Sequence, residues 1–213
     1  MTSSSPQAAG LLSSPTTTAS ITTYAASPIS NQDAFEFPIY SRFPPLYSIQ
    51  PNLATQSEQM ERWSSLITSY CAHYRIFVLS LSSLPPDLFH QSTIRRTLRE
   101  SDIRKVLDWM AKSENGGRAE WIPANARNIQ SSTCYVYWRT PTEWADLIYA
   151  WVDETGQKGT ILTLYELRES DAVNGKDWRD MDEDLLKRVL NVLVKRGKAQ
   201  IFGQEETSGI KFF

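Results

Sequence analysis

The sequence predicts an α+β protein built from two small tandem domains that follow a long N-terminal tail. Three observations support this prediction. The 213 residues are enough for two separate small cores. Stretches with helical apolar spacing alternate with short runs of aromatic and β-branched residues, which are typical of strands. The same succession of elements also occurs twice, which indicates an internal repeat.

Residues 1–33 form the predicted tail. Ser, Thr, Ala and Pro dominate this segment, and Asp33 is its only charged residue. Such a composition has too little apolar surface to offset the entropy of ordering, so we expect disorder. The first basic residue is Arg42, which does not fit an Arg-rich transit peptide, and no apolar stretch is long enough for a membrane span.

A proline-aromatic arm opens the first predicted domain, residues 34–139. It contains Phe37 and then Phe43, Pro44, Pro45, Leu46 and Tyr47. Each proline fixes its own φ and biases the preceding residue away from helix, so we expect an extended, stiff segment. Two interpretations stay open: the arm covers its own domain, or its rings enter pockets on another protein. The run 44–47 also fits the short pattern read by WW domains, which recurs by chance.

The remainder of the first domain is predicted to contain three helices and a two-stranded hairpin. An apolar stripe over 60–71 has helical spacing, and 76–79 reads as a strand. After a break at 84–87 we expect a second helix through Ile94 and Leu98, and then a third that Ser101 and Asp102 can cap. Strands at 118–122 and 134–138 follow. This order of elements predicts a winged helix.

The second predicted domain, residues 140–213, begins with a capping box. The hydroxyl of Thr140 can accept from the Glu143 amide, while the Glu143 carboxylate reaches back. Further elements are a helix to about 151, a strand at 160–162, a helical turn at 164–167, a helix after 180–184, and strands at 198–202 and 209–213. Segment 117–122 aligns with 197–202, so we expect the second domain to repeat the winged helix.

The charge of the chain argues against nucleic acid as a partner. Lys and Arg total 22 against 24 Asp and Glu, which gives a net charge of -2 and a pI near 5.8. A winged-helix DNA-binding transcription regulator is the alternative function, because this fold often places its third helix in the major groove. Acids near the start of both third helices, including 182–184, would repel phosphates.

No motif indicates an enzyme, a cofactor or a metal site. His73 and His90 form no metal-ligand pattern with Cys71 or Cys134, and the chain has no Gly-rich phosphate loop. The two cysteines lie in apolar stretches, which fits a reduced, cytosolic compartment. The seven tryptophans are interpreted mainly as core residues rather than as a ligand cage.

Residues 35–213 resemble the small winged-helix subunit of ESCRT-II, the endosomal sorting complex, known as the vacuolar protein sorting-associated protein 25 family. The chain looks like a fungal-like variant with an N-terminal extension. The resemblance is carried in order by residues 43–47, 50–52, the Trp63 helix, and residues 94–98, 119–121, 138–139, 143–144, 147–152, 156–157, 162–167 and 210–213. The departures are the tail, residues 140–142 and the extended turn at 115–117.

This resemblance implies a non-catalytic subunit in the multivesicular body sorting of ubiquitinated membrane proteins. Two copies of the chain would dock on the two larger ESCRT-II subunits through the arm residues Phe37, Phe43, Pro44, Pro45, Leu46 and Tyr47. Arg96 would pair with an acidic group on those subunits, or would be an ordinary solvated residue.

The resemblance also implies a role for the second domain. Residues 141–213 would bind the first helix of an ESCRT-III subunit, without identified contact residues. We therefore expect a cytoplasmic protein that is recruited peripherally to endosomal membranes, with its membrane association indirect through the complex.

Overall fold

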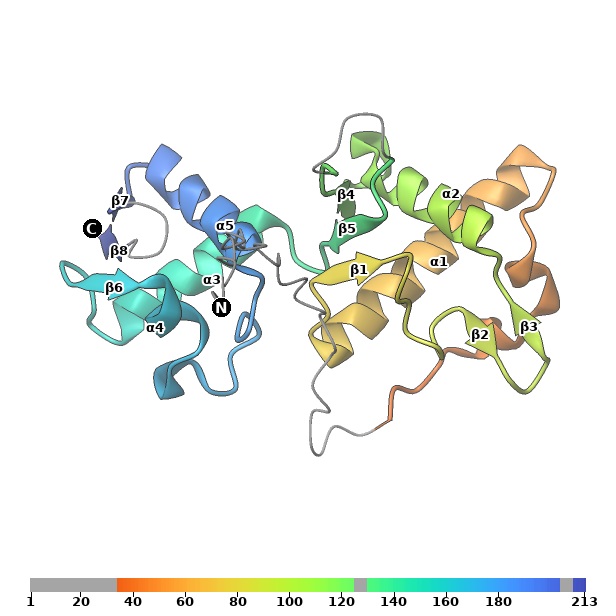
Figure 1. Ribbon diagram of the computed structural model, residues 1–213, viewed down its shortest axis with the longest axis horizontal. Coiled ribbons are helices and arrows are strands. Elements are labelled where there is room, and N and C mark those ends of the chain that lie inside the picture. The colour runs from red at the N-terminus through yellow and green to blue at the C-terminus, as the bar shows by residue number, and fades with distance from the viewer. Residues whose placement is uncertain (1–33, 125–129, 204–208) are drawn as a thin grey trace, which may run out of the picture. The chain divides into compact units, whose positions relative to one another are not determined.

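The computed structural model describes residues 34–124, 130–203 and 209–213 (Figure 1). The predicted disordered tail, residues 1–33, lies outside the described residues. Residues from Ala34 to Phe213 belong to one compact unit. Within this unit we call the described residues up to 139 the first module and those from 140 onward the second module.

The first module combines two long helices with a small antiparallel sheet. Its elements are η1 (Ile39–Arg42), η2 (Pro44–Tyr47), α1 (Leu53–Tyr74), β1 (Val78–Ser80), β2 (His90–Gln91), β3 (Arg96–Thr97), α2 (Glu100–Ala111), η3 (Ser113–Asn115), β4 (Ala119–Trp121) and β5 (Thr133–Val136). The predicted stripe of α1 is buried from Met60 to Cys71, and it packs against α2 in one apolar cluster. The stripe therefore faces a core, as predicted.

The helix predicted through Ile94 and Leu98 is wrong. The structure has the β2–β3 hairpin there, in which His90 pairs with Thr97. The backbone amide of Leu98 donates to the Phe89 carbonyl at 3.0 Å, and both side chains are buried. These two apolar residues lie at the same end of the two-stranded ladder. Burial of these two side chains attaches the hairpin to the core, and a helix with an apolar stripe is not required there.

The start of α2 also differs from the prediction. The helix begins at Glu100, and its N-cap residue, Arg99, makes no side-chain cap. Asp102 lies inside the first turn, where its carboxylate pairs with Lys105 at 2.9 Å. An acid in the first turn still interacts favourably with the helix dipole, so α2 needs no capping hydroxyl.

The second module contains three helices and a second antiparallel sheet. Its elements are α3 (Pro141–Glu154), β6 (Ile161–Thr163), α4 (Leu164–Arg168), η4 (Asp171–Val173), α5 (Glu183–Lys195), β7 (Ala199–Phe202) and β8 (Gly209–Phe212). The capping box at Thr140 is confirmed, with the Glu143 amide donating to Thr140 Oγ1 at 3.2 Å. A second capping box, formed by Thr163 and Glu166, starts α4. This second capping box was not predicted from the sequence.

The two sheets share one topology, which confirms the internal repeat. The strand orders are β1-β5-β4 and β6-β8-β7, and all pairs are antiparallel. Ala119 pairs with Val136 in the first sheet, and Ala199 pairs with Phe212 in the second. The alignment of residues 117–122 with 197–202 therefore places equivalent residues at equivalent positions.

Contacts join the two modules through their cores and through a polar network. Phe77, Tyr135 and Tyr137 of the first module belong to the apolar cluster that fills the second. The Tyr137 hydroxyl donates to Glu120 at 2.8 Å, and the Arg188 guanidinium on α5 also pairs with Glu120. Each named strand pairing lies entirely before or entirely after residue 139, whereas the apolar cluster of the second module extends into the first module. The domain boundary at 139/140 stays a prediction.

Candidate protein-docking site

Helix α1 holds the proline-aromatic arm by side-chain hydrogen bonds to its backbone, two of them to the same carbonyl. Trp63 Nε1 and Gln59 Nε2 each donate to the Leu46 carbonyl oxygen at 2.9 Å. Leu46 and Tyr47 are buried, with exposures of 3% and 7%. For Leu46 and Tyr47, the structure therefore supports the interpretation that the arm covers its own domain.

The extended path predicted for the arm is wrong over residues 39–47. Two 3-10 turns, η1 and η2, replace it. Pro44 and Pro45 occupy the first positions of η2, where a backbone N–H has no partner within the turn and a φ near -65° is required. The same two residues that predicted an extended chain therefore suit the start of a turn.

Gln59 is a functional residue that the sequence analysis missed. Its Nε2 also donates to the carbonyls of Pro45 at 3.1 Å and Ser48 at 2.9 Å, and its Oε1 accepts from the Gln50 amide at 3.1 Å. The side chain is buried, so these bonds satisfy an amide that would otherwise be costly to desolvate. Its position four residues before Trp63, on the buried face of α1, was the available signal.

Aromatic contacts fix the rest of the arm. Tyr47 meets the Trp63 ring edge to face at 5.6 Å, and its hydroxyl donates to the Ser41 carbonyl at 2.9 Å. Burial raises the pKa of Tyr47 to about 12, so this hydroxyl stays a donor. Phe37 is half-buried and packs against Phe35, with ring centroids 5.0 Å apart.

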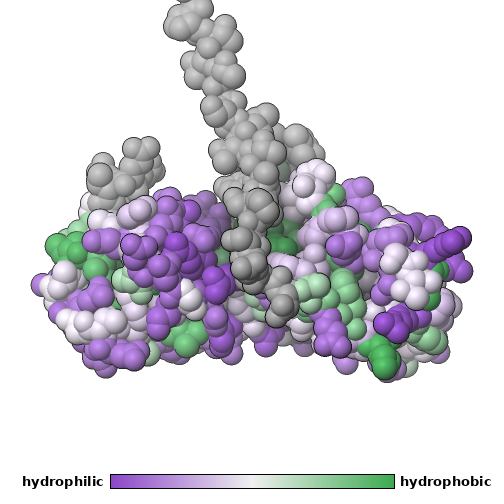
Figure 2. Space-filling model, turned by 90° about the horizontal axis from the view of Figure 1, so that it is seen from below, coloured by the Kyte–Doolittle hydropathy of each residue, from purple (hydrophilic) through white to green (hydrophobic). Residues whose placement is uncertain are grey.

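The outward side of the same arm is apolar and exposed. Ile39 is 87% exposed and Phe43 is 61% exposed, and the rings of Pro44 and Pro45 are also exposed. We call these four residues the exposed arm. Because η2 is fixed by Trp63 and Gln59, the exposed arm is presented by a structured segment. Figure 2 shows apolar surface as separate green patches within a mainly hydrophilic face.

Arg96 lies on β3, next to η2 of the arm, and it is exposed. It is a strand residue, and the helix expected around it is absent. None of the acidic side chains among the described residues forms an ion pair with its guanidinium. The structure thus brings Arg96 and the exposed arm to the same part of the first module.

A second apolar surface lies on the outward side of the second sheet. Leu162, Ile210 and Phe212 point into the core, and the alternate residues point outward. We call Ile161, Phe202, Lys211 and Phe213 the sheet face; the polar residues Thr163 and Gln200 also point outward beside them.

Gly209 leaves room on the sheet face for the Ile161 side chain. A Cβ added to it would lie 2.6 Å from Ile161 Cγ2, so the Ile161 side chain covers the Gly209 backbone. The first module has Thr133 at the equivalent position, because Thr133 pairs with Ser80 as Gly209 pairs with Thr163. The apolar surface around Ile161 therefore depends on a feature that the first sheet lacks.

Tyr149 anchors the last residue of the sheet face. Its hydroxyl donates to the Phe213 carbonyl at 2.7 Å. The ammonium groups of Lys198 and Lys158 lie 4.3 and 4.7 Å from the centre of the Tyr149 ring. These distances are those of cation–π contacts. We call these two lysines the basic rim; Lys158 is also paired with Asp153 at 2.8 Å.

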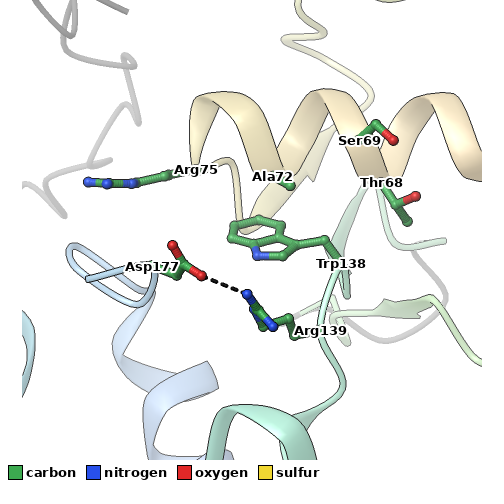
Figure 3. Close-up of a pocket in the computed structure, with 7 residues that line it drawn as sticks. All are labelled: Thr68, Ser69, Ala72, Arg75, Trp138, Arg139 and Asp177. Atoms are coloured by element: carbon green, nitrogen blue, oxygen red, sulfur yellow. Dashed lines mark hydrogen bonds and ion pairs between the residues drawn. The ribbon is translucent and has the colours of Figure 1, made fainter. Parts of the chain in front are cut away.

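A pocket of about 340 Å³ lies between α1, the last two residues of the first module and Asp177 of the second module (Figure 3). The Trp138 ring lies between Ala72 and the ion pair of Arg139 with Asp177, whose N–O distance is 2.9 Å. Arg75 extends away from this pair. The Asp177 carboxylate is already paired, and the pocket lining contains no histidine or cysteine. The pocket therefore offers no nucleophile with an adjacent base.

The chemically reactive residue types have structural roles. Cys71 and Cys134 are both free and buried, and burial raises the pKa of the Cys134 thiol to about 12, so it stays protonated. His90 Nδ1 lies 2.7 Å from Thr97 Oγ1 across the hairpin, and His73 packs against Phe35. Over residues 34–124, 130–203 and 209–213, no three potential ligand side chains could hold a metal ion together.

The helix that would read DNA in the second module starts with acids that are already engaged. Asp182 caps α5 by accepting from the Leu185 amide at 3.1 Å, and Glu183 pairs with Lys187 at 2.7 Å. This acidic helix start would face phosphates in a major-groove complex and repel them. Also, no helix in the described part of the chain has both the length and the apolar character to cross a bilayer.

Comparison with known proteins identifies the family. A family model described as ESCRT-II complex subunit matches residues 39–182, which include residues 39–47 of the arm and the β2–β3 hairpin and end at Asp182, the N-cap of α5. The chain belongs to the ESCRT-II complex subunit family. This result agrees with the resemblance found in the sequence.

Individual relatives align with this chain over more residues than the family model does. The chain is 36% identical over 180 residues to vacuolar protein-sorting-associated protein 25 of Xenopus laevis, covering 84% of this chain and 99% of the relative. The protein of the same name from Dictyostelium discoideum is 33% identical over 196 residues, covering 87% and 99%. The family resemblance therefore reaches nearly all of each relative.

Solved structures of ESCRT-II subunits share the fold. The crystal structure of subunit VPS25 of the endosomal trafficking complex ESCRT-II matches with a TM-score of 0.71 and 28% identity, over 83% of this chain and 98% of that one. A chain in the crystal structure of endosomal complex ESCRT-II (VPS22/VPS25/VPS36) matches with a TM-score of 0.72 and 28% identity, over 82% of this chain and 98% of that one. The α+β fold with small antiparallel sheets is thus an ESCRT-II subunit fold.

Proposed function

We propose that this chain is a non-catalytic ESCRT-II subunit that joins two kinds of partner. Its first module docks on the two larger ESCRT-II subunits, and its second module recruits an ESCRT-III subunit. Two copies of the chain are present in each complex, which reaches endosomal membranes through its other subunits. The protein then acts in the sorting of membrane proteins into multivesicular bodies by binding alone.

The exposed arm is the observation that carries this proposal. Leu46 and Tyr47 anchor the arm to α1, while Phe43 and the two prolines stay exposed on the opposite side. Exposed aromatic and proline rings on a fixed backbone lose little entropy when they enter a pocket. Similarity to VPS25, which is solved together with VPS22 and VPS36, supports the larger ESCRT-II subunits as the owners of that pocket.

Arg96 belongs to the same docking surface in this proposal. It lies beside η2, is exposed, and has no ion-pair partner among the described residues. A guanidinium can bind a carboxylate through two parallel hydrogen bonds, which adds directional specificity to the apolar contact of the arm. An acidic group on a larger subunit is the complementary feature.

The sheet face of the second module is the surface we propose for ESCRT-III. Ile161, Phe202 and Phe213 expose apolar side chains together with Lys211. An amphipathic helix could lay its apolar side on these residues and place acidic groups near the basic rim. Two such faces held in one complex would raise the local concentration of ESCRT-III subunits, which promotes assembly without chemistry.

Two reciprocal variants test the proposal in the full-length chain. The arm variant carries Phe43→Ala, Pro44→Ala and Pro45→Ala, which leaves the buried anchors Leu46 and Tyr47 intact. The face variant carries Ile161→Ala and Phe202→Ala. Each variant is the matched control for the other, because both remove exposed apolar side chains.

The first readout is co-purification with the two larger ESCRT-II subunits, and the second is binding of a labelled peptide of the first helix of an ESCRT-III subunit. We expect the arm variant to lose only the first interaction and the face variant only the second, with unchanged circular dichroism. Failure of the wild-type chain to form the complex would refute the proposal. Loss of both interactions in one variant would show that the modules do not act separately.

A further inference from the structure

Four arginines gather at the exposed arm, beyond the single Arg96 of the proposed docking surface. They are Arg42 at the end of η1 and Arg95, Arg96 and Arg99 on and after the β2–β3 hairpin. All four are exposed. We call them the arginine cluster.

One hydrogen bond and one strand pairing bring the two segments together. Gln91 pairs with Arg96 across the hairpin, and Gln91 Nε2 donates to Ser41 Oγ at 3.2 Å. Arg42 is the residue after Ser41, so it lies near the strand that carries Arg96. Arg95 adopts a left-handed conformation with φ of 49°, which ends the turn directly before Arg96.

The arginine cluster is not ion-paired within the chain. Segments 37–50 and 88–99 contain these four arginines and no acidic residue, and Glu36, Asp87 and Glu100 lie directly next to the ends of these segments. None of the four forms an ion pair with any acidic side chain of the described residues. Most lysines and arginines elsewhere, such as Arg139 and Arg188, have such partners. Four exposed arginines without an ion pair therefore lie beside the exposed arm.

The geometry points to an acidic segment of the ESCRT-II partner as the ligand of the arginine cluster, and we propose that this charge pairing guides the arm into its pocket. The inference rests on the proposed function and deepens it from one arginine to four. The cluster contains only arginine, and the first lysine of the chain is Lys105. Guanidinium groups match carboxylates in a bidentate geometry, whereas lysine contributes a point charge.

Continuity with the exposed arm favours a protein ligand over a membrane. The apolar residues next to the cluster are already assigned to a partner pocket, so the carboxylates that reach the cluster would border that pocket. Rim charges of this kind mainly increase the association rate and its dependence on salt. Apolar contacts at the centre of an interface mainly set the dissociation rate.

The test measures the association and dissociation rates of the full-length chain with the two larger ESCRT-II subunits at about 50, 150 and 500 mM salt. The cluster variant is Arg95→Glu with Arg99→Glu, which leaves Arg96 and the arm unchanged. Its matched control is Lys176→Glu with Lys195→Glu, which changes the net charge equally in the second module, where neither lysine is ion-paired. Circular dichroism and thermal melting confirm that both variants fold.

We expect the cluster variant to associate about tenfold more slowly than the wild type at the lowest salt, with the difference shrinking as salt screens the charges. The control should associate at the wild-type rate. Equal association of the cluster variant and its control would overturn the inference and leave the arm proposal intact. Absence of binding by every form, the wild type included, would refute the proposed function and the inference with it.

A vesicle-binding experiment distinguishes an acidic protein segment from anionic lipid as the ligand of the arginine cluster. The same proteins are mixed with neutral phosphatidylcholine vesicles and with vesicles containing about one fifth phosphatidylserine. We expect no more binding to the anionic vesicles by the wild type than by the cluster variant. Vesicle binding that requires Arg95 and Arg99, together with unchanged binding to the ESCRT-II subunits, would assign the arginine cluster to lipid and sink the proposal.

Discussion

The two modules share one sheet topology but differ in what surrounds it. Between its first strand and its last helix, the first module has the β2–β3 hairpin, whereas the second has α4 with its own capping box. The first module also carries the arm, and the second carries the sheet face made possible by Gly209. The shared scaffold sets the cores, and the segments that differ supply the proposed docking surfaces. Both proposed docking surfaces therefore lie where the second module departs from an exact repeat of the first.

The largest expected effect is on the free energy of unfolding, and it comes from two buried tryptophans, only one of which also positions the arm. Trp63 and Trp144 are both fully buried, one in each module. Replacing either with alanine should lower the free energy of unfolding by about 3–5 kcal/mol. Only Trp63→Ala also removes the bond to the Leu46 carbonyl, so only this variant should speed hydrogen exchange of the amides in 46–50. Chemical denaturation and exchange mass spectrometry check the two results.

Equal exchange of the arm in both variants would contradict the role given to Trp63. Gln59 would then be the sole anchor of the Leu46 carbonyl, and Gln59→Leu becomes the decisive variant. Its control is Gln56→Leu, one turn earlier on α1, because Gln56 is less buried and its side chain makes none of the arm contacts.

An intermediate effect is expected where the two sheets differ most. Gly209→Ala would press a methyl group against Ile161 and should cost about 1–3 kcal/mol of stability. The double variant Gly209→Ala with Ile161→Ala should recover most of that loss, because the opposing side chain is shortened. A double-mutant cycle by urea unfolding measures this coupling.

Additive effects in that cycle would show that Ile161 does not restrict Gly209. The equivalent residue of the first sheet supplies the control. Thr133→Ala introduces the same alanine at the same sheet position, where a side chain is already accommodated. We expect it to have no coupling to Ile161.

The smallest expected effect concerns the junction between the modules. Burial raises the pKa of Glu120, but the hydrogen bonds from Arg188 and Tyr137 outweigh burial, so the pKa lies below its ordinary value. A carboxyl with a lowered folded-state pKa stabilises the fold above its unfolded pKa, near 4.3, and loses this contribution as the pH falls through the folded value. Junction stability should therefore decrease below about pH 4.5.

Arg188→Met tests this cause directly. The variant should raise the pKa of Glu120 toward its ordinary value, measured by NMR titration of the side-chain carboxyl. Glu166 provides the internal reference, because Thr163 lowers its pKa within the second module alone. An unchanged Glu120 titration in the variant would show that Arg188 does not stabilise the carboxylate.

Much of the fold could be predicted from the sequence because local patterns determine it. The apolar stripes of α1 and α5, the capping box at Thr140 and the aligned strands at Ala119 and Ala199 all depend on spacing within one segment. The β2–β3 hairpin could not be predicted in this way. Its strands have two residues each, and burial of Phe89 and Leu98 against the core selects the hairpin.

The sequence predicted which residues form the arm, but not which of them are buried and which are exposed. The run of prolines and aromatics singled out the arm, and the family resemblance added Arg96. Which residues of the arm are buried depends on Gln59 and Trp63, which lie on another element. The sheet face was not identified at all, because pairing of β6 with β8 brings Ile161 over Gly209 from a distant part of the sequence.

The Glu120–Arg188 pair also has a mechanical consequence. In the proposed function, an ESCRT-III subunit bound to the sheet face would pull on the second module. The backbone at residues 139 and 140 would carry that load, while the Arg188–Glu120 pair and the apolar contacts of Phe77 and Tyr135 would resist rotation of one module against the other. The exposed arm and the sheet face would therefore keep a fixed relative orientation under load.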